Sequence, residues 1–279
     1  MSDVIGQVRE VVVERSGCFL HAWVCGPEMA PLVVLLHGAT MDHRMFGTQV
    51  GPLLEAGYRV MTMDLRGHGV SKPIGPGPLQ VTDLADDVLA LVGEVTADRF
   101  VVVGQSLGAY VAQNLVLRYP QRILALGIIG ATCTTAPISR AELFLLRSSL
   151  LWFRLWPYGH LQGLMATSLA LSPGVRAYAR EAMSALSKQE FLAVWDAVTR
   201  VPRPRPGYRI EHPLLLTHGD EDRTGTIARS APAWAARDPQ ARYEIVPDAR
   251  HNANQDNPAF FNRVLVEFLA EHAPAGKTR

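Results

Sequence analysis

The chain has 279 residues, of which 48% are hydrophobic and 19% charged. This composition is typical of a folded globular protein and excludes a disordered chain, and the length suits one large domain or a core with an insertion. The formal net charge of +1 gives no electrostatic reason to expect a nucleic-acid partner.

No segment predicts a signal peptide or a membrane span. The first residues, MSDVIGQVREVVVERSG, lack a basic start followed by a long apolar run. The nearest candidate for a span, residues 148–172, is interrupted by Arg154 and Pro157. The three cysteines have neither a metal-binding spacing nor an even-numbered disulfide framework; they are Cys18, Cys25 and Cys133. We therefore expect a cytoplasmic protein with free thiols and no integral membrane part.

Short β-branched runs alternate with helical stretches along the chain. A hairpin around Ser16-Gly17 is predicted to open it, followed by apolar strands. The strands are predicted over 8–14, 18–25, 32–36, 58–64, 99–104, 123–129, 214–218 and 243–246. Helices are predicted near 45–56, 82–95, 107–118 and 226–237, and from Asn257-Pro258 onward. Thr82 is the predicted N-cap of the second helix, with Asp83 in its first turn. This alternation indicates an α/β fold, a mostly parallel sheet with helices on both faces.

The alternation of predicted strands and helices stops between residues 135 and 207. Helical patterns occur at 141–156, 174–186 and 188–200, without a convincing strand, and the stretch ends in the proline-rich VPRPRPG. We interpret it as a helical cap inserted between two sheet strands. The predicted division is a core at 1–134, the cap at 135–207 and the rest of the core at 208–279.

The sequence GQSLG places Ser106 between a predicted strand and a predicted helix. In a G-x-S-x-G turn of this kind the serine occupies a sharp, strained position, and the glycines leave room where a Cβ would collide with nearby backbone. The hydroxyl then lies at the carboxyl edge of the sheet, beside a helix N-terminus that favours negative charge. The pattern predicts that Ser106 is a nucleophile.

A nucleophilic serine needs a base, an acid that orients the base, and donors for the oxyanion. His251 follows the last predicted strand and precedes the last helix, which is a suitable place for the base. The loop HGDEDRTG offers Asp220, Glu221 and Asp222 as acids. The segment after strand 123–129, GATCTTAP, contains no acidic residue, which favours the later loop. In LLHGAT, the backbone N–H of Ala39 is the first expected oxyanion donor and that of Leu107 the second.

These loops together resemble those of the α/β-hydrolase family, in the chain order Ser…Asp…His. The resemblance covers about residues 20 to 271 and also includes MDLRGHGVS, whose matching residues are mainly structural in the family: Asp64, Arg66, His68 and Ser71. It implies an α/β-hydrolase fold with a helical cap and the roles Ser106 nucleophile, His251 base and Asp222 acid. Asp222 is preferred because the family's acid usually lies three residues past the glycine of this loop, here Gly219.

The implied chemistry is cleavage of a small to medium apolar ester or lactone through an acyl-enzyme, without a metal or other cofactor. Serine in place of aspartate as nucleophile argues against haloalkane dehalogenase and epoxide hydrolase chemistry, and HGAT differs from the HGGG of one group of lipases. An amide- or carbon–carbon-cleaving enzyme, or a ligand-binding protein with little turnover, remains open. We expect a monomer or homodimer.

The cap is expected to line the substrate pocket with large apolar side chains. The residues expected there are Trp152, Phe153, Trp156, Met165, Met183 and Trp195.

Overall fold

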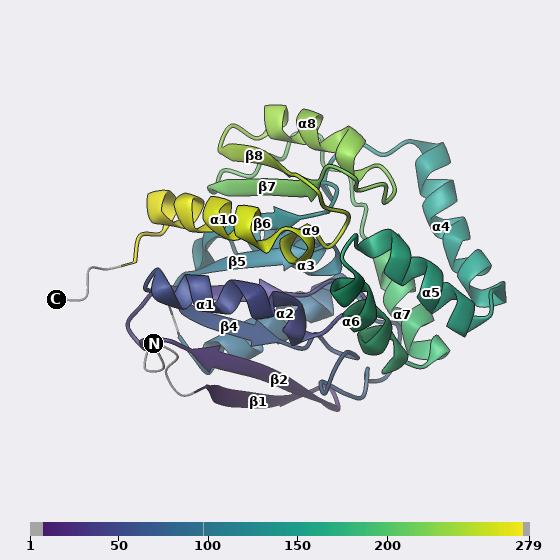
Figure 1. The fold of residues 1–279 in the computed structure, drawn as a ribbon, viewed down its shortest axis with the longest axis horizontal. Coiled ribbons are helices and arrows are strands. Elements are labelled where there is room, and N and C mark those ends of the chain that lie inside the picture. Colours follow the sequence, from purple (N-terminus) through teal and green to yellow (C-terminus); the bar gives the residue numbers. More distant parts are fainter. Residues whose placement is uncertain (1–7, 97, 276–279) are drawn as a thin grey trace.

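One eight-stranded sheet runs through the computed structural model, which describes residues 8–96 and 98–275 (Figure 1). The strand order is β1-β2-β4-β3-β5-β6-β7-β8. The strands are β1 Arg9–Arg15, β2 Cys18–Cys25, β3 Leu32–Leu36, β4 Arg59–Met63, β5 Phe100–Gln105, β6 Ile123–Ile129, β7 Leu214–Gly219 and β8 Ala241–Val246. β2 pairs antiparallel with β1 and β4, and all other neighbours are parallel. The predicted mostly parallel sheet is therefore confirmed.

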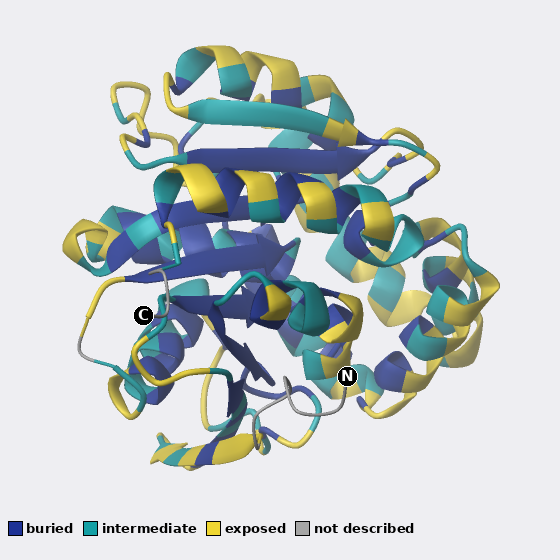
Figure 2. Cartoon of the chain, turned by 60° about the vertical axis from the view of Figure 1, so that its left-hand side comes forward, coloured by how far each residue is buried: buried dark blue, intermediate teal, exposed yellow. Residues whose placement is uncertain are grey.

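Helices cover both faces of this sheet. On one face lie α1 (Gly47–Glu55) and α10 (Pro258–His272), and on the other lie α2 (Val81–Gly93), α3 (Leu107–Arg118) and α8 (Ile227–Arg237). Along β3, Val33 and Leu35 pack on the first face while Val34 packs on the second, as the two-residue period of a strand requires. Figure 2 shows the central strands buried and the outward sides of the helices exposed. Because both faces are covered, these strands are continuous apolar runs.

The start of α2 differs from the prediction. The helix begins at Val81, with Gln80 in the N-cap position and no side-chain cap, so the assignment of Thr82 as N-cap is wrong. The backbone is still extended at Gln80 (φ −127°, ψ 148°), and Thr82 already lies inside the first turn. Asp83 is in that turn, as expected.

Four helices between β6 and β7 in the chain lie beside the carboxyl ends of the strands, and we refer to this segment, predicted to be a cap, as the cap (Figure 1). They are α4 (Arg140–Leu155), α5 (Tyr158–Leu169), α6 (Pro173–Ser184) and α7 (Lys188–Thr199). The helix α5 was not predicted, since Gly159 and Gly163 are poor helix formers and Pro157 precedes them.

The two ends of the cap segment lie side by side. The Arg203 N–H donates to the Thr134 carbonyl (2.9 Å) and the Arg205 N–H to the Thr135 carbonyl (2.8 Å). The chain therefore leaves and rejoins the core at one place.

Three short helices, η1 (His43–Phe46), η2 (Pro120–Arg122) and α9 (Ala253–Asp256), complete the described elements. None of the described helices combines the length and apolar character that a bilayer span requires. The cysteines form no disulfide among the described residues, as predicted, and all three are buried. The expectation of no signal peptide falls partly on residues 1–7, which lie outside the described residues.

A buried ion pair joins three elements of the core. Two nitrogens of Arg66, in the loop after β4, each donate to Asp87 of α2 at 2.7 Å. Arg15, at the end of β1, donates to the same carboxylate at 2.7 Å. The side chains of Asp87 and Arg66 are 0% and 4% exposed, so neither charge has water as an alternative partner.

Replacing Asp87 by asparagine should therefore leave the Arg66 guanidinium buried without its counter-charge. We expect Asp87→Asn to lower the free energy of unfolding by about 3–5 kcal/mol, measured by urea denaturation. The matched control is Asp86→Asn, whose half-buried carboxylate pairs with Arg118 and Arg15 near the surface, and which should lose about 1 kcal/mol or less. Equal losses in both variants would contradict this account.

Candidate active site

Ser106 lies at the sharp turn between β5 and α3, as predicted. Its backbone has φ 48° and ψ −108°, in the left-handed half of conformational space that side chains rarely adopt. A Cβ on Gly104 would collide with the backbone of Gly108, and one on Gly108 would collide with the carbonyl of Leu36. Both glycines are therefore sterically required, and the turn packs directly against the end of β3.

Asp222 and His251 form a buried pair at the same edge of the sheet. The distance between His251 Nδ1 and Asp222 Oδ2 is 3.0 Å, and both side chains are almost fully buried. The Thr224 N–H donates to the other oxygen of Asp222 at 2.8 Å. Burial by itself raises the pKa of Asp222, but the His251 ring and the Thr224 N–H outweigh burial and hold that pKa below its ordinary value.

The other two acids of this loop have different partners. Asp220 accepts a hydrogen bond from the Ala249 N–H (3.0 Å), and the Glu221 carboxylate lies 3.8 Å from Arg250 Nε. The structure thus brings Asp222 to His251 and uses Asp220 to join the loops after β7 and β8.

Gln105, which sequence reasoning missed, connects the serine turn to the histidine loop. Its amide Nε2 donates to the His251 carbonyl at 3.0 Å, and its Oε1 lies against Gly38. A Cβ on Gly38 would stand 3.5 Å from Cβ of Ser106, and one on Gly130 would stand 3.0 Å from His251 Nδ1. The signal in the sequence was a polar side chain at the end of the apolar strand FVVVG.

The side chains of Ser106 and His251 are not hydrogen-bonded to each other. Among the described residues, no hydrogen bond joins the Ser106 hydroxyl to the His251 ring. Such contacts are often long in proteins without substrate and tighten when substrate binds. The geometry therefore gives a tight acid–histidine pair with the serine turn held beside it.

His37 orients the peptide that precedes Ala39. The Leu65 N–H donates to His37 Nε2 at 2.9 Å, so the ring proton is on Nδ1, which donates to the Gly38 carbonyl at 2.7 Å. In a trans peptide the carbonyl and the following N–H point in opposite directions. Because His37 holds the Gly38 carbonyl, it turns the Ala39 N–H the other way. Leu107 is the first residue of α3, where an N–H has no acceptor within the helix.

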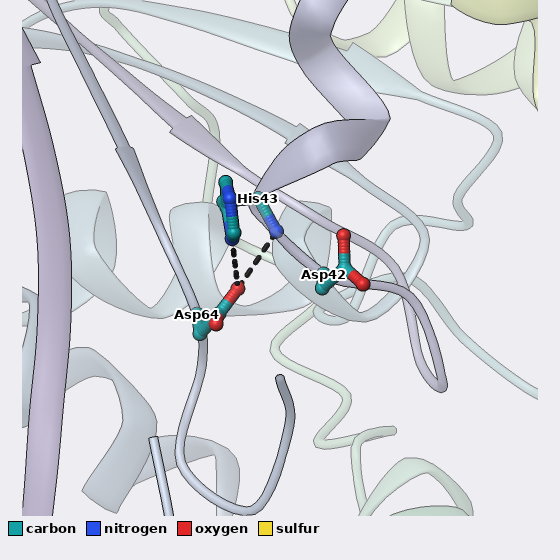
Figure 3. Close-up of side chains that lie close together, drawn as sticks. All are labelled: Asp42, His43 and Asp64. Atoms are coloured by element: carbon teal, nitrogen blue, oxygen red, sulfur yellow. Dashed lines mark hydrogen bonds and ion pairs between the residues drawn. The ribbon is translucent and has the colours of Figure 1, made fainter. Parts of the chain in front are cut away.

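The cluster of Asp42, His43 and Asp64 has the composition of a metal site, but both of its carboxylates already accept hydrogen bonds from protein donors (Figure 3). Asp64 accepts hydrogen bonds from the backbone N–H and Nδ1 of His43, both at 2.8 Å, and from the Val70 N–H. Both oxygens of Asp42 accept from Arg44. With a guanidinium already in place, the cluster acts as a brace between the loops after β3 and β4.

Part of the cap is fixed to the loops that carry the site. In α6, the Tyr178 hydroxyl bonds the backbone and carboxylate of Asp42 at 3.2 Å. On the other side, the Asp256 carboxylate accepts from the backbone N–H groups of Leu171, Ser172 and Arg250 at 2.9–3.0 Å. The helix α6 is therefore bonded to the loop of Ala39, and residues 171–172, which precede it, are bonded through Asp256 to the loop of His251.

The structure contradicts two of the expected pocket residues. Trp152, near the end of α4, and Trp156, the residue that follows it, are 63% and 44% exposed, so neither is enclosed in an apolar pocket. Phe153 and Trp195 stack with Phe191 inside the cap, which makes them part of its own core. Met183 is buried, and Met165 is half-buried in α5.

Comparison with known proteins shows that the chain belongs to the alpha/beta hydrolase family. Residues 33–264 match the model of the Alpha/beta hydrolase family. The AB hydrolase superfamily protein YfhM of Bacillus subtilis is 28% identical over 92% of this chain and 96% of its own. A solved hydrolase from Pseudomonas aeruginosa PA01 is 25% identical, with TM-score 0.80, over 95% of this chain and 98% of that one. The enol-lactonase from Burkholderia xenovorans LB400 shares the fold at 24% identity, TM-score 0.80, over 93% and 100% of the two chains.

Two neutral histidines behind the site should make the fold sensitive to acid. Burial lowers the pKa of both His37 and His68, that of His68 to about 3. In the unfolded chain histidine titrates near pH 6.5. Below that pH the unfolded chain therefore binds protons that the folded chain does not, and stability falls by up to about 1.4 kcal/mol per pH unit for each histidine.

The variant His68→Asn removes the contribution of His68 to the pH dependence of stability. Asparagine is chosen because it keeps a donor for the Arg66 carbonyl, which His68 Nδ1 contacts at 3.1 Å. We expect the loss of unfolding free energy between pH 7 and pH 5 to be smaller in the variant than in the wild type, measured by urea denaturation. An identical slope in the two proteins would show that His68 does not stay neutral.

Proposed function

Because the chain belongs to the alpha/beta hydrolase family, we propose that it cleaves carboxylic esters or lactones of small to medium apolar substrates with Ser106 as nucleophile. The observation that carries the proposal is the strained Ser106 turn beside the buried Asp222–His251 pair. These three residues come from the ends of β5, β7 and β8, in the order that a Ser-Asp-His triad has in this fold.

The reaction follows from the placement of these groups. Ser106 Oγ attacks the substrate carbonyl carbon while His251 Nε2 accepts its proton, and Asp222 keeps the ring oriented through Nδ1 and stabilises the imidazolium. The N–H groups of Ala39 and Leu107 stabilise the oxyanion. The intermediate then expels the alcohol, which takes the proton from His251. A water molecule deprotonated by His251 attacks the acyl-enzyme, releasing the acid and restoring Ser106.

The ester or lactone class is supported by the kind of nucleophile and by one structural neighbour. A serine hydroxyl forms an acyl-enzyme with a carbonyl substrate, which suits esters and lactones. The enol-lactonase from Burkholderia xenovorans LB400 has the same fold along nearly the whole chain. The chemistry above requires neither a metal ion nor an organic cofactor at any step.

Catalytic variants test the assigned roles. We expect Ser106→Ala to lose several orders of magnitude in kcat, as other triad removals do, without loss of the fold. Asp222→Asn should lose about 10⁴-fold because the histidine tautomer becomes wrong. Asp220→Asn is the matched control in the same loop and should lose little. A fluorophosphonate probe located by mass spectrometry should label Ser106; labelling at Ser71 instead, or a larger loss in Asp220→Asn, would reassign the site.

The substrate class is tested by a panel of nitrophenyl esters from acetate to palmitate, with lactones and vinylogous diketones beside them. A small apolar site gains about 0.8 kcal/mol for each methylene it buries until it is full, so kcat/KM should rise to about butyrate or hexanoate and then fall. Preference for the diketones would indicate a carbon–carbon hydrolase. Binding of these compounds without turnover would indicate a ligand-binding protein.

The orienting role of His37 gives a separate prediction. In His37→Ala the Gly38 carbonyl loses its donor, so the Ala39 N–H is no longer held in place. We expect kcat on the best ester to fall by about 10²–10³-fold with little change in KM, as when an oxyanion donor is removed. His37→Asn can still donate to that carbonyl and should recover part of the rate. If KM rather than kcat changes, or asparagine recovers nothing, His37 has a different role.

A further inference from the structure

The outer face of the cap carries large apolar side chains that no other element covers. They belong to α4, to the residue that follows it and to α5, and they are between 44% and 71% exposed. This apolar cap face consists of Phe144, Leu145, Leu151, Trp152, Leu155, Trp156 and Leu164. Figure 1 shows α4 along the outer margin of the cap, away from the sheet.

The helix α4 is apolar on two opposite sides. At about 100° per residue, Phe144, Leu151 and Leu155 lie along one line of the helix, with Trp152 on the adjacent line. Phe153 projects from the opposite side and packs, with its ring tilted, against the α7 residues Phe191 and Trp195 at ring distances of 5.6 and 5.0 Å. The inner side is thus satisfied by cap packing, whereas the outer side has no partner among the described residues.

Positive charge borders this face. Arg140, Arg147 and Arg154 recur every seven residues and therefore lie along one edge of the exposed apolar arc. None of the three forms an ion pair with a described carboxylate. The acid of α4, Glu142, is paired with Arg229 at 2.6 Å. The whole chain has a net charge of only +1, so this concentration of cations is local.

We propose that the apolar cap face docks on the surface of an anionic lipid bilayer, with α4 lying in the interface. An exposed apolar face with tryptophan and bordering arginines is the pattern of interfacial helices, and tryptophan rings favour the headgroup level. The helix is about 24 Å long, less than the roughly 30 Å hydrocarbon core, so it lies on the bilayer without crossing it.

A second copy of the chain fits this surface less well. A two-fold pairing of antiparallel α4 helices would place the arginine row of each copy on the same side of the contact, where like charges repel. Anionic lipid instead supplies the opposite charge along that edge. The docking is independent of the proposed reaction, because it can be measured without turnover.

The test is co-sedimentation of the full chain with phosphatidylcholine vesicles, with and without phosphatidylglycerol. We expect binding to the anionic vesicles that weakens as salt is added, with a blue shift of tryptophan fluorescence. The double variants Trp152→Ser/Leu155→Ser and Arg147→Gln/Arg154→Gln should each weaken binding at least about tenfold. The control Phe19→Ser/Ile245→Ser removes two apolar residues of β2 and β8 that are also about half exposed, 52% and 47%, and should bind like the wild type.

Circular dichroism of all variants verifies that they fold, which is expected because every substituted side chain is exposed or half-exposed. The proposal is overturned if the wild type does not bind anionic vesicles, or if Trp152→Ser/Leu155→Ser binds them as well as the wild type. A dimer seen by analytical ultracentrifugation that dissociates in the same variant would also overturn it, by identifying a second copy as the partner.

Discussion

The close packing of the β5–α3 turn against the end of β3 is the constraint on which the rest of the site depends. Gly104 and Gly108 allow backbone to approach backbone there, and no side chain at either position leaves room for the contact. Gln105 extends the same turn into the histidine loop through the His251 carbonyl. The strain at Ser106 is thus maintained by contacts on both sides, which keeps its hydroxyl at the sheet edge.

The cap combines two kinds of attachment. The helix α6 is bonded through Tyr178, and the residues just before it through Asp256, to the loops on either side of the site, which ties this part of the cap to those loops. In contrast, α4 has no fully buried residue and depends on the packing of Phe153 against α7. A difference in rigidity between these two parts follows, because regions with few buried contacts open at lower free energy.

Sequence reasoning was accurate where structure is decided locally. The strands at 32–36 and 123–129 have the predicted bounds, since buried β-branched runs allow few alternatives. The choice of Asp222 among the three acids of HGDEDRTG came from the family resemblance, and the structure places Asp222 beside His251. It failed where distant contacts decide. Nothing in the sequence near Trp152 tells which side of α4 packs inward, and the loop-to-loop bonds of Gln105 join residues far apart in the chain.

The side-by-side arrangement of Thr134–Thr135 with Arg203–Arg205 has a consequence for how this protein can evolve. Since the inserted segment begins and ends at adjacent points, the core needs to close only a short gap, and the entropy of loop closure grows slowly with the length inserted. A cap of different length or sequence can be exchanged at this junction without shifting the register of β6 and β7. The inserted segment can thus be replaced as one module while the strands that carry Ser106, Asp222 and His251 keep their order and pairing.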